Sequence, residues 1–478
     1  MSPDGRVQQT GLICGLHGLA GPAFERVENN QAGYMQRLTV DQNFSVVPSS
    51  CMLVRKDLYL GVGGMDEGLP AGQLGDIDLC FKIAKSGGLI VWTPHAVLVQ
   101  EAQQVAPSDQ ADRDIVSGRW LDLLANDPAY NRNCTLRGRA FELDSRASLN
   151  WQPLKWRPLP VVLGYPNASR EALESRVVAP FNALREAGLI DGAICDEWLN
   201  LAELRRYAPD VVVFQDNLSV LPVDAMREAR MLPGCLIVLE VHAFLSTSPS
   251  GVQLDPVQRW ESLSQAASLA DRLIVPTRAL ADAFAPLHPD VRVLETRLGG
   301  EWLDLPFNSE AHQRPRVGCA IESSTSLDPQ LLAVVVEALA DRVDWVLWGE
   351  VPDSLRALAY EVHDGALQQD PQRLVALRLD LALAPLGTGG LDGCRSALPL
   401  LQYGACGFGV ICSDTPAYDN SLEVTRVSNT PERWVGAIER HLAAPALSRQ
   451  QAQKLRQQVC QEWMLDVGGA AAWLEGWV

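Results

Sequence analysis

Short apolar runs and longer amphipathic segments alternate along most of the chain after residue 158. A run that is apolar throughout and bounded by turn residues is typical of a strand buried on both faces of a parallel sheet. Segments 172–188 and 329–341 carry apolar residues at helical spacing and predict helices between such strands. The expected strands are 159–165, 210–215, 234–242, 270–277, 291–296, 316–321, 343–349, 379–386 and 409–414. The pattern therefore predicts an α/β fold with two successive parallel sheets.

Breaks in this pattern divide the chain into five parts. Segment 151–160 (WQPLKWRPLP), with three prolines, is the predicted linker. It separates a first block, 1–150, from two sheet domains, 161–305 and 313–442. The last part, 443–478, predicts helices whose apolar end is expected to pack back on the first sheet domain. We expect the two sheet domains to form a cleft at the carboxyl ends of their strands, where ligands bind in such folds.

The first block has a shorter pattern of the same kind. Residues 51–54 predict a strand, and a short helix is expected after it. Segment 75–88 (GDIDLCFKIAKSGG) predicts an amphipathic helix with Asp76 and Asp78 in its first turn, where carboxylates suit the helix dipole. The apolar run 89–94 (LIVWTP) predicts a buried strand.

Composition narrows the class of protein. The net charge of −18 disfavours a nucleic-acid partner, because an acidic surface repels phosphate backbones. No apolar run approaches the ~20 residues that span a bilayer, so at most peripheral membrane contact is expected. The N-terminus has no signal-peptide pattern, and the eleven cysteines show no metal-ligand spacing. These features predict a cytoplasmic protein with reduced thiols and no metal site.

A glycine-rich loop (PLGTGGLDGC) precedes an apolar helix, which the expected strand 409–414 follows. Free backbone N–H groups at a helix start after such a loop attract phosphate, so Gly389 and Gly390 are candidate phosphate-binding residues. Arg395 and Ser396, where the helix is expected to begin, would add donors. Gln402, about two turns further, could bind a sugar hydroxyl. The alternative is that these glycines only make turns.

The stretch 400–418 (LLQYGACGFGVICSDTPAY) resembles the donor-binding segment of family 4 glycosyltransferases, which commonly reads LLEYGACGxPVIASD. The resemblance extends over much of residues 158–442. It implies the GT-B fold, in which two Rossmann-like domains face a cleft. Two departures stand out, since Gln402 replaces the family's glutamate and Gly409 replaces its proline.

This resemblance also implies roles for the candidate residues. Gly389, Gly390, Arg395 and Ser396 would bind the donor diphosphate, and Gln402 would bind the ribose. The GT-B module would require no cofactor, and the nucleotide sugar would be its substrate.

A histidine follows the expected strand 234–242 of the first sheet domain. His242, close after Glu240, could act as a base or hydrogen-bond a sugar hydroxyl near neutral pH. In GT-B enzymes a polar residue at this place often faces the transferred sugar. The alternative is a histidine with a structural role in a loop.

The first block resembles the carboxyl half of family 2 glycosyltransferases of the GT-A fold, through MDE, DIDLCFKIAKSGG and LIVWTPHAVLV. The resemblance implies that Asp76 corresponds to the catalytic base. The family's nucleotide-binding half and its metal-binding DxD are missing, and Gln100 stands where a metal-ligand histidine is usual. This block is therefore interpreted as a degenerate remnant, or as part of a longer chain.

Together these resemblances imply an enzyme, a glycosyltransferase of cell-surface polysaccharide or O-antigen biosynthesis. It would move a sugar from a nucleotide sugar to a glycan or lipid-linked acceptor. A second glycosyltransferase or a second copy of the chain is a further expected partner. The alternative function is a catalytically inactive scaffold that binds a glycan or a partner enzyme.

Overall fold

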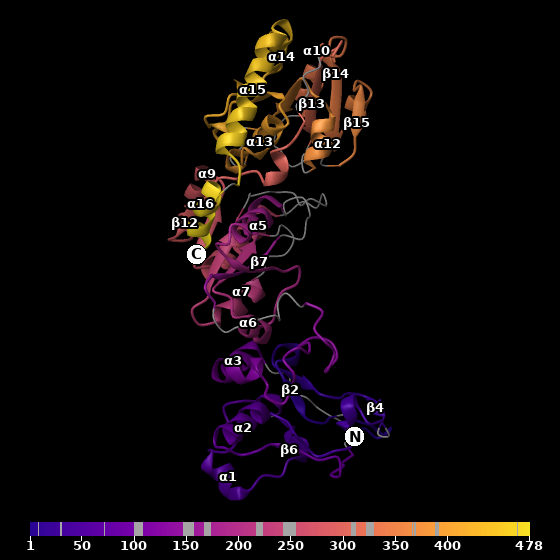
Figure 1. Ribbon diagram of the computed structural model, residues 1–478, viewed down its shortest axis with the longest axis vertical. Coiled ribbons are helices and arrows are strands. Elements are labelled where there is room, and N and C mark those ends of the chain that lie inside the picture. The colour runs from indigo at the N-terminus through magenta and orange to yellow at the C-terminus, as the bar shows by residue number, and fades with distance from the viewer. Residues whose placement is uncertain are drawn as a thin grey trace. The chain divides into compact units, whose positions relative to one another are not determined.

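The chain forms two compact units in a computed structural model (Figure 1). The first unit comprises Met1–Arg157, Trp198–Pro209 and Arg227–Cys235, and the second comprises Pro158–Glu197, Asp210–Met226 and Leu236–Val478. The structure describes residues 1–7, 9–28, 31–70, 72–99, 109–146, 157–166, 174–216, 223–241, 255–306, 312–321, 329–365, 367, 370–387, 392–465 and 467–478.

The second unit begins with a six-stranded parallel sheet in the order β12-β11-β10-β9-β7-β8. Its central strands are valine- and leucine-rich, and β7 and β9 are fully buried while β10 is buried except at Leu236, because helices cover a parallel sheet on both faces. The strands are β7 (Val161–Tyr165), β8 (Asp191–Ile194), β9 (Val211–Gln215), β10 (Leu236–Glu240), β11 (Arg272–Val275) and β12 (Val291–Val293).

A second parallel sheet follows in the order β15-β14-β13-β16-β17-β18. The chain adds strands outward on one side of β13 and then returns to add the rest on the other side, next to β16. The strands are β13 (Arg316–Ile321), β14 (Asp344–Gly349), β15 (Glu361–His363), β16 (Leu381–Ala384), β17 (Gly409–Ser413) and β18 (Thr425–Val427). The α/β fold with two parallel sheets, as predicted, is confirmed.

Helices connect these strands and follow them. The two helices expected at 172–188 and 329–341 are confirmed, the first as a π-helical turn (Glu174–Val178) that runs into α5 (Ala179–Glu186). The others are α6 (Leu201–Tyr207), α7 (Val223–Arg230), α8 (Pro256–Leu269), α9 (Arg278–Phe284), α10 (Pro329–Leu339), α11 (Asp353–Arg356), α12 (Pro371–Ala376), α13 (Leu398–Ala405), α14 (Pro431–Ala443), α15 (Pro445–Glu462) and α16 (Val467–Trp477).

Helix α13 lies against α15 (Figure 1). A Cβ atom on Gly404 would come within 2.9 Å of Val459 and 3.0 Å of Leu455. Gly407 then ends the helix region in the left-handed conformation, with φ 77°, which a glycine adopts without steric cost. The glycines of the GACG stretch therefore serve close helix packing and a tight exit into β17.

The C-terminal helix α16 returns to the first sheet, as expected from its apolar sequence. Trp473 and Trp477 are buried in the same core as Val162, Phe181 and Ile274. Burial of two indole side chains against the sheet ties the end of the chain to this domain.

Besides α6, the described residues of the first unit form short strands and the α-helices α1, α2 and α3. They are β1 (Arg6–Val7), β2 (Leu12–Cys14), β3 (Ala20–Pro22), β4 (Val27–Glu28), β5 (Gln42–Asn43), β6 (Val91–Trp92), α1 (Lys56–Gly61), α2 (Gln73–Lys85) and α3 (Gln110–Ala125). The predicted helix near 75–88 is confirmed as α2. Its buried face packs against the hydrophobic residues Leu12, Val46 and Val116.

Two predictions for this block are wrong. Residues 51–54 form the end of a 3₁₀ turn and an extended segment instead of a strand, and Leu53 is fully exposed. The run 89–94 contributes only the two residues of β6, and Leu89 and Val91 are largely exposed. An apolar run indicates burial only where other elements cover it, and within the described residues β6 pairs with β5 alone.

Candidate functional site

The carboxyl ends of β16 and β17 lie side by side in the second sheet, where Ala384 pairs with Cys412. This is next to the point where the strand order reverses, between β13 and β16. In open α/β sheets such a reversal opens a crevice in which ligands bind. The predicted glycine loop leaves the sheet here, at Gly387. Gly389 and Gly390 lie outside the described residues.

The helix after this loop begins later than the sequence predicts. Helix α13 starts at Leu398, with Ala397 as its N-cap, so Arg395 and Ser396 precede the helix and do not open it. No side chain caps this start, and Pro399 removes one N–H group from its first turn. Arg395 and Ser396 are partly exposed beside it. The arrangement offers backbone donors and two polar side chains after the carboxyl end of β16, which suits an anion.

Gln402 lies in the second turn of α13 and is almost buried, with 6% of its surface exposed. Its neighbours Leu401 and Tyr403 belong to the hydrophobic core of the second sheet, where Tyr403 meets Trp348 edge to face. The neutral amide is compatible with this location, since burying a carboxylate would cost more free energy. Contact of Gln402 with a ribose stays a prediction.

The carboxyl edge of the first sheet holds a buried ion pair that sequence reasoning missed. Arg176 Nε lies 2.9 Å from Glu240 Oε2, and neither side chain is more than 1% exposed. Burial raises the pKa of Glu240 to about 7, although Arg176 lowers it. Arg176 also donates to the Leu294 carbonyl and lies over the Trp473 ring. This pair joins β10 to α16 and has no exposed surface with which to meet a substrate.

A second buried pair lies at the same edge. Asp216, directly after β9, accepts hydrogen bonds from Arg259 of α8. His242, two positions after Glu240, lies outside the described residues, so its role stays a prediction.

Asp76 lies in the first turn of α2, as predicted, but is only 4% exposed. Burial raises the pKa of Asp76, and hydrogen bonds from Ser49 offset part of that effect. Asp78 is fully buried, with Lys82 Nζ at 2.6 Å and the Trp120 indole N–H at 2.9 Å. Both carboxylates therefore face the interior of the first unit. Gln100 lies outside the described residues.

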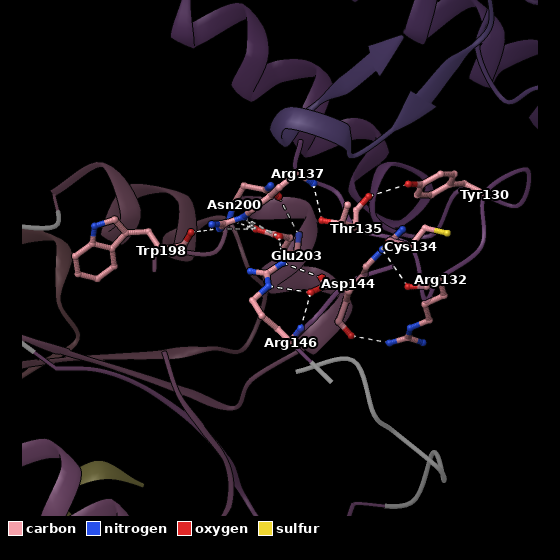
Figure 2. A network of polar contacts seen from close by, with 11 residues as sticks. Tyr130, Arg132, Cys134, Thr135, Arg137, Asp144, Arg146, Trp198, Asn200 and Glu203 are labelled. Atoms are coloured by element: carbon pink, nitrogen blue, oxygen red, sulfur yellow. Dashed lines mark hydrogen bonds and ion pairs between the residues drawn. The ribbon is translucent and has the colours of Figure 1, made fainter. Parts of the chain in front are cut away.

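A polar cluster in the first unit centres on Glu203 of α6 (Figure 2). Arg137 Nε lies 2.9 Å and 3.0 Å from its two oxygens, and Arg146 Nη2 lies 2.6 Å from Oε1. Glu203 also forms a capping box with Asn200. The spacing of Asn200 and Glu203 is a signal from which this capping box could have been predicted.

Among the residues that the structure covers, no group of three or more His, Cys, Asp or Glu side chains could hold a metal ion. Within the same residues, no helix has the length and apolar character needed to cross a bilayer.

Comparison of the sequence with known proteins gives two curated relatives, and no family model matches. An uncharacterized protein, y4gI, from Sinorhizobium fredii is 35% identical over 152 residues, which are 30% of this chain and 17% of that protein. The O-antigen biosynthesis protein RfbC from Myxococcus xanthus is 27% identical over 143 residues, 28% of this chain and 11% of that protein. The chain thus covers less than a fifth of the length of each relative.

Solved structures that are similar include a glycosyltransferase from Rickettsia africae ESF-5, with 11% identity and a TM-score of 0.48 over 67% of this chain and 98% of that one. Another is Anabaena HepE in complex with UDP and glucose, with 12% identity and a TM-score of 0.44 over 66% of this chain and 98% of that one. A sucrose-phosphate synthase from Thermosynechococcus elongatus has 12% identity and a TM-score of 0.46 over 66% and 98%.

Proposed function

We propose that the chain is a glycosyltransferase that moves a sugar from a nucleotide sugar to a glycan or lipid-linked acceptor. The observation that carries this proposal is the location of the glycine loop and the start of α13, at the carboxyl ends of the strands and beside the reversal in strand order. The resemblance of residues 400–418 to a donor-binding segment supports it. The partial match to an O-antigen biosynthesis protein favours cell-surface polysaccharide synthesis. The location that we propose for it is the cytoplasm.

Transfer would rest on electrostatic stabilisation of the leaving nucleoside diphosphate. Backbone N–H groups of the loop and of the start of α13, with the Arg395 guanidinium, would neutralise the charge that develops on the phosphate. This arrangement needs no metal ion. Gln402 would bind the ribose, and His242 would deprotonate or orient a hydroxyl in the first sheet domain.

The second candidate function is a scaffold that binds a glycan or a partner enzyme without transferring sugar. The neutral Gln402 in place of a glutamate and the burial of Asp76 favour this reading. The two functions differ in one observable property, since an enzyme transfers or hydrolyses the donor sugar and a scaffold only binds.

Binding of UDP, GDP and TDP, measured by isothermal titration calorimetry, tests the donor site. Replacing Arg395 with alanine should weaken nucleotide binding by ~1.5–3 kcal/mol, because a charge-assisted phosphate contact is lost. Arg449→Ala, on the exposed surface of α15, is the matched control and should bind like the wild type. Equal affinities of the Arg395 variant and the wild type would contradict the proposed site.

Turnover of the corresponding sugar nucleotides then separates enzyme from scaffold. Release of nucleotide in the presence of a glycan or lipid-linked acceptor supports the enzyme. Tight binding without release, across the panel of donors and acceptors, would favour the scaffold. Gln402→Glu should preserve or strengthen nucleotide binding if residue 402 contacts the ribose.

A further inference from the structure

The backbone of Leu386 and the side chains of Ser413 and Asn429 form a closed ring of hydrogen bonds at the point where the chain leaves β16. The Leu386 N–H donates to Ser413 Oγ at 2.8 Å, and Ser413 Oγ donates to Asn429 Oδ1 at 2.7 Å. Asn429 Nδ2 closes the ring by donating to the Leu386 carbonyl at 2.7 Å. Both backbone groups of Leu386 are therefore held by side chains.

The ring supplies the backbone hydrogen bonds that a neighbouring strand would make if β16 continued to Leu386. Strand β16 stops at Ala384, so the buried backbone groups of Leu386 need partners other than a neighbouring strand. Ser413 is the last residue of β17, and Asn429 follows β18, so the ends of three adjacent strands supply the ring. The Trp434 indole N–H, 3.4 Å from Asn429 Oδ1, adds a further contact to the amide.

Burial makes this arrangement stiff. Ser413 is fully buried, Leu386 and Trp434 are each 1% exposed, and Asn429 is partly buried. In such surroundings a hydrogen bond is stronger than in water, and an unpaired group is costly. The residue after Leu386 is Gly387, the first of the glycine-rich loop. The ring thus fixes the place and direction in which that loop leaves the sheet.

We propose that Ser413 and Asn429 are positioning residues for nucleotide binding, which hold Leu386 so that the glycine loop presents its backbone to a diphosphate. This inference rests on the proposed function. Neither residue needs to touch the nucleotide, because both act through the backbone of Leu386, which leads directly into the proposed phosphate-binding loop. A loop that is anchored at one end loses less entropy when a ligand binds.

Calorimetric titration with UDP, GDP and TDP tests the inference on the whole chain. Ser413→Ala and Asn429→Ala should each raise the Kd of the nucleotide that binds the wild type by about tenfold, the equivalent of about one hydrogen bond. The double variant should be weakened by less than the product of the two effects, because each single change already opens the ring. Ser413→Thr keeps the hydroxyl and should recover affinity.

Ser448→Ala is the matched control for a buried serine in the same domain. Its hydroxyl lies 2.8 Å from His441 Nδ1, close to Gly409 at the other end of β17. This variant should lose stability as Ser413→Ala does but keep the Kd of the wild type. If the Ser448 variant weakens nucleotide binding as strongly as the Ser413 variant, the effect is general loss of stability and the inference is overturned.

Hydrogen exchange of the backbone gives a readout that needs no ligand. Peptides that cover residues 381–398 should exchange faster in Ser413→Ala and Asn429→Ala than in the wild type or the Ser448 variant. Unchanged exchange and unchanged Kd in both variants would overturn the positioning role alone. A wild type that binds none of the three nucleotides would overturn the proposed function, and the role in nucleotide binding with it.

Discussion

Arg146 Nη2 lies 2.6 Å from Glu203 Oε1, so a residue near the end of the first block binds a helix that is more than fifty positions away in the sequence. Glu203 belongs to α6, which connects β8 to β9 of the first sheet in sequence but packs in the first unit. Arg206, one turn further, donates to the carbonyl oxygens of Ala125 and Cys134 in the same unit. The first unit therefore includes a helix, α6, whose sequence lies between two strands of the first sheet.

Replacing Glu203 with glutamine should destabilise the protein by ~2–3 kcal/mol, because charge-assisted hydrogen bonds to Arg137 and Arg146 are lost together. Urea unfolding measures the change. The matched control is Glu186→Gln at the exposed end of α5, which should stay within about 0.5 kcal/mol of the wild type. A Glu203 variant as stable as this control would show that the cluster contributes little to folding.

Gly404→Ala should destabilise the protein by ~1–3 kcal/mol, because the new methyl group would overlap Val459 and Leu455 of α15. Gly436→Ala is the control, since it also lies inside a helix, α14, but a Cβ there meets nothing within 4 Å. That change should stabilise by about 0.5–1 kcal/mol through helix propensity. The thermal midpoints of the two variants should therefore move in opposite directions from that of the wild type.

The sheets were the most predictable part of the fold. Runs such as 210–215 and 316–321 are mainly apolar, and a sheet covered on both faces buries most of their apolar residues. The start of α13 was predicted about two residues too early, because Arg395 and Ser396 are polar and resemble a helix start. The N-cap residue is Ala397, and an alanine does not indicate a helix start in a sequence.

The buried charge pairs could not be predicted from sequence order. Arg176 and Glu240 lie far apart in the chain and meet only because β10 ends beside the helical turn that follows β7. The ring at Leu386 is hidden for the same reason, since its members come from the ends of three strands. Local patterns specify elements, while such contacts depend on the strand order that brings the elements together.

His441 should make the stability of the protein depend on pH below neutrality. Burial lowers the pKa of His441, whose ring nitrogens face the hydroxyls of Thr425 and Ser448, with the charge of Arg440 lowering it further. The unfolded chain therefore binds a proton more readily than the folded one, and stability falls as the pH drops below the ordinary histidine pKa of ~6.5.

The measurement is urea unfolding at pH 7.5 and pH 5.5. The free energy of unfolding should fall less between these two pH values in His441→Gln than in the wild type, since the glutamine does not titrate. His95→Gln, at an exposed turn of the first unit, serves as the control and should follow the wild type. An identical pH dependence of the His441 variant and the wild type would show that the imidazole has the same pKa in the folded and the unfolded protein.

Asp76 and Asp78 provide a matched pair of carboxylates two positions apart on α2. Oδ1 of Asp76 has no hydrogen-bond partner among the described residues, whereas Asp78 is bound by Lys82 and Trp120. Burial raises the pKa of Asp76, so the folded protein binds its proton more tightly than the unfolded chain does. The stability from this group is thus lost as pH rises from the unfolded pKa through the folded one, and at pH 7 the ionised group is a net cost.

Asp76→Asn should therefore change the free energy of unfolding at pH 7 by less than about 1 kcal/mol, or raise it, because the buried charge is removed. Asp78→Asn should lower it by ~1.5–3 kcal/mol, since an ion pair with Lys82 is broken. If the donor site lies in the second sheet domain, sugar transfer by the Asp76 variant should be nearly intact. A folded Asp76→Asn protein whose turnover falls by about a hundredfold or more would identify Asp76 as a catalytic base and move the active site to the first unit.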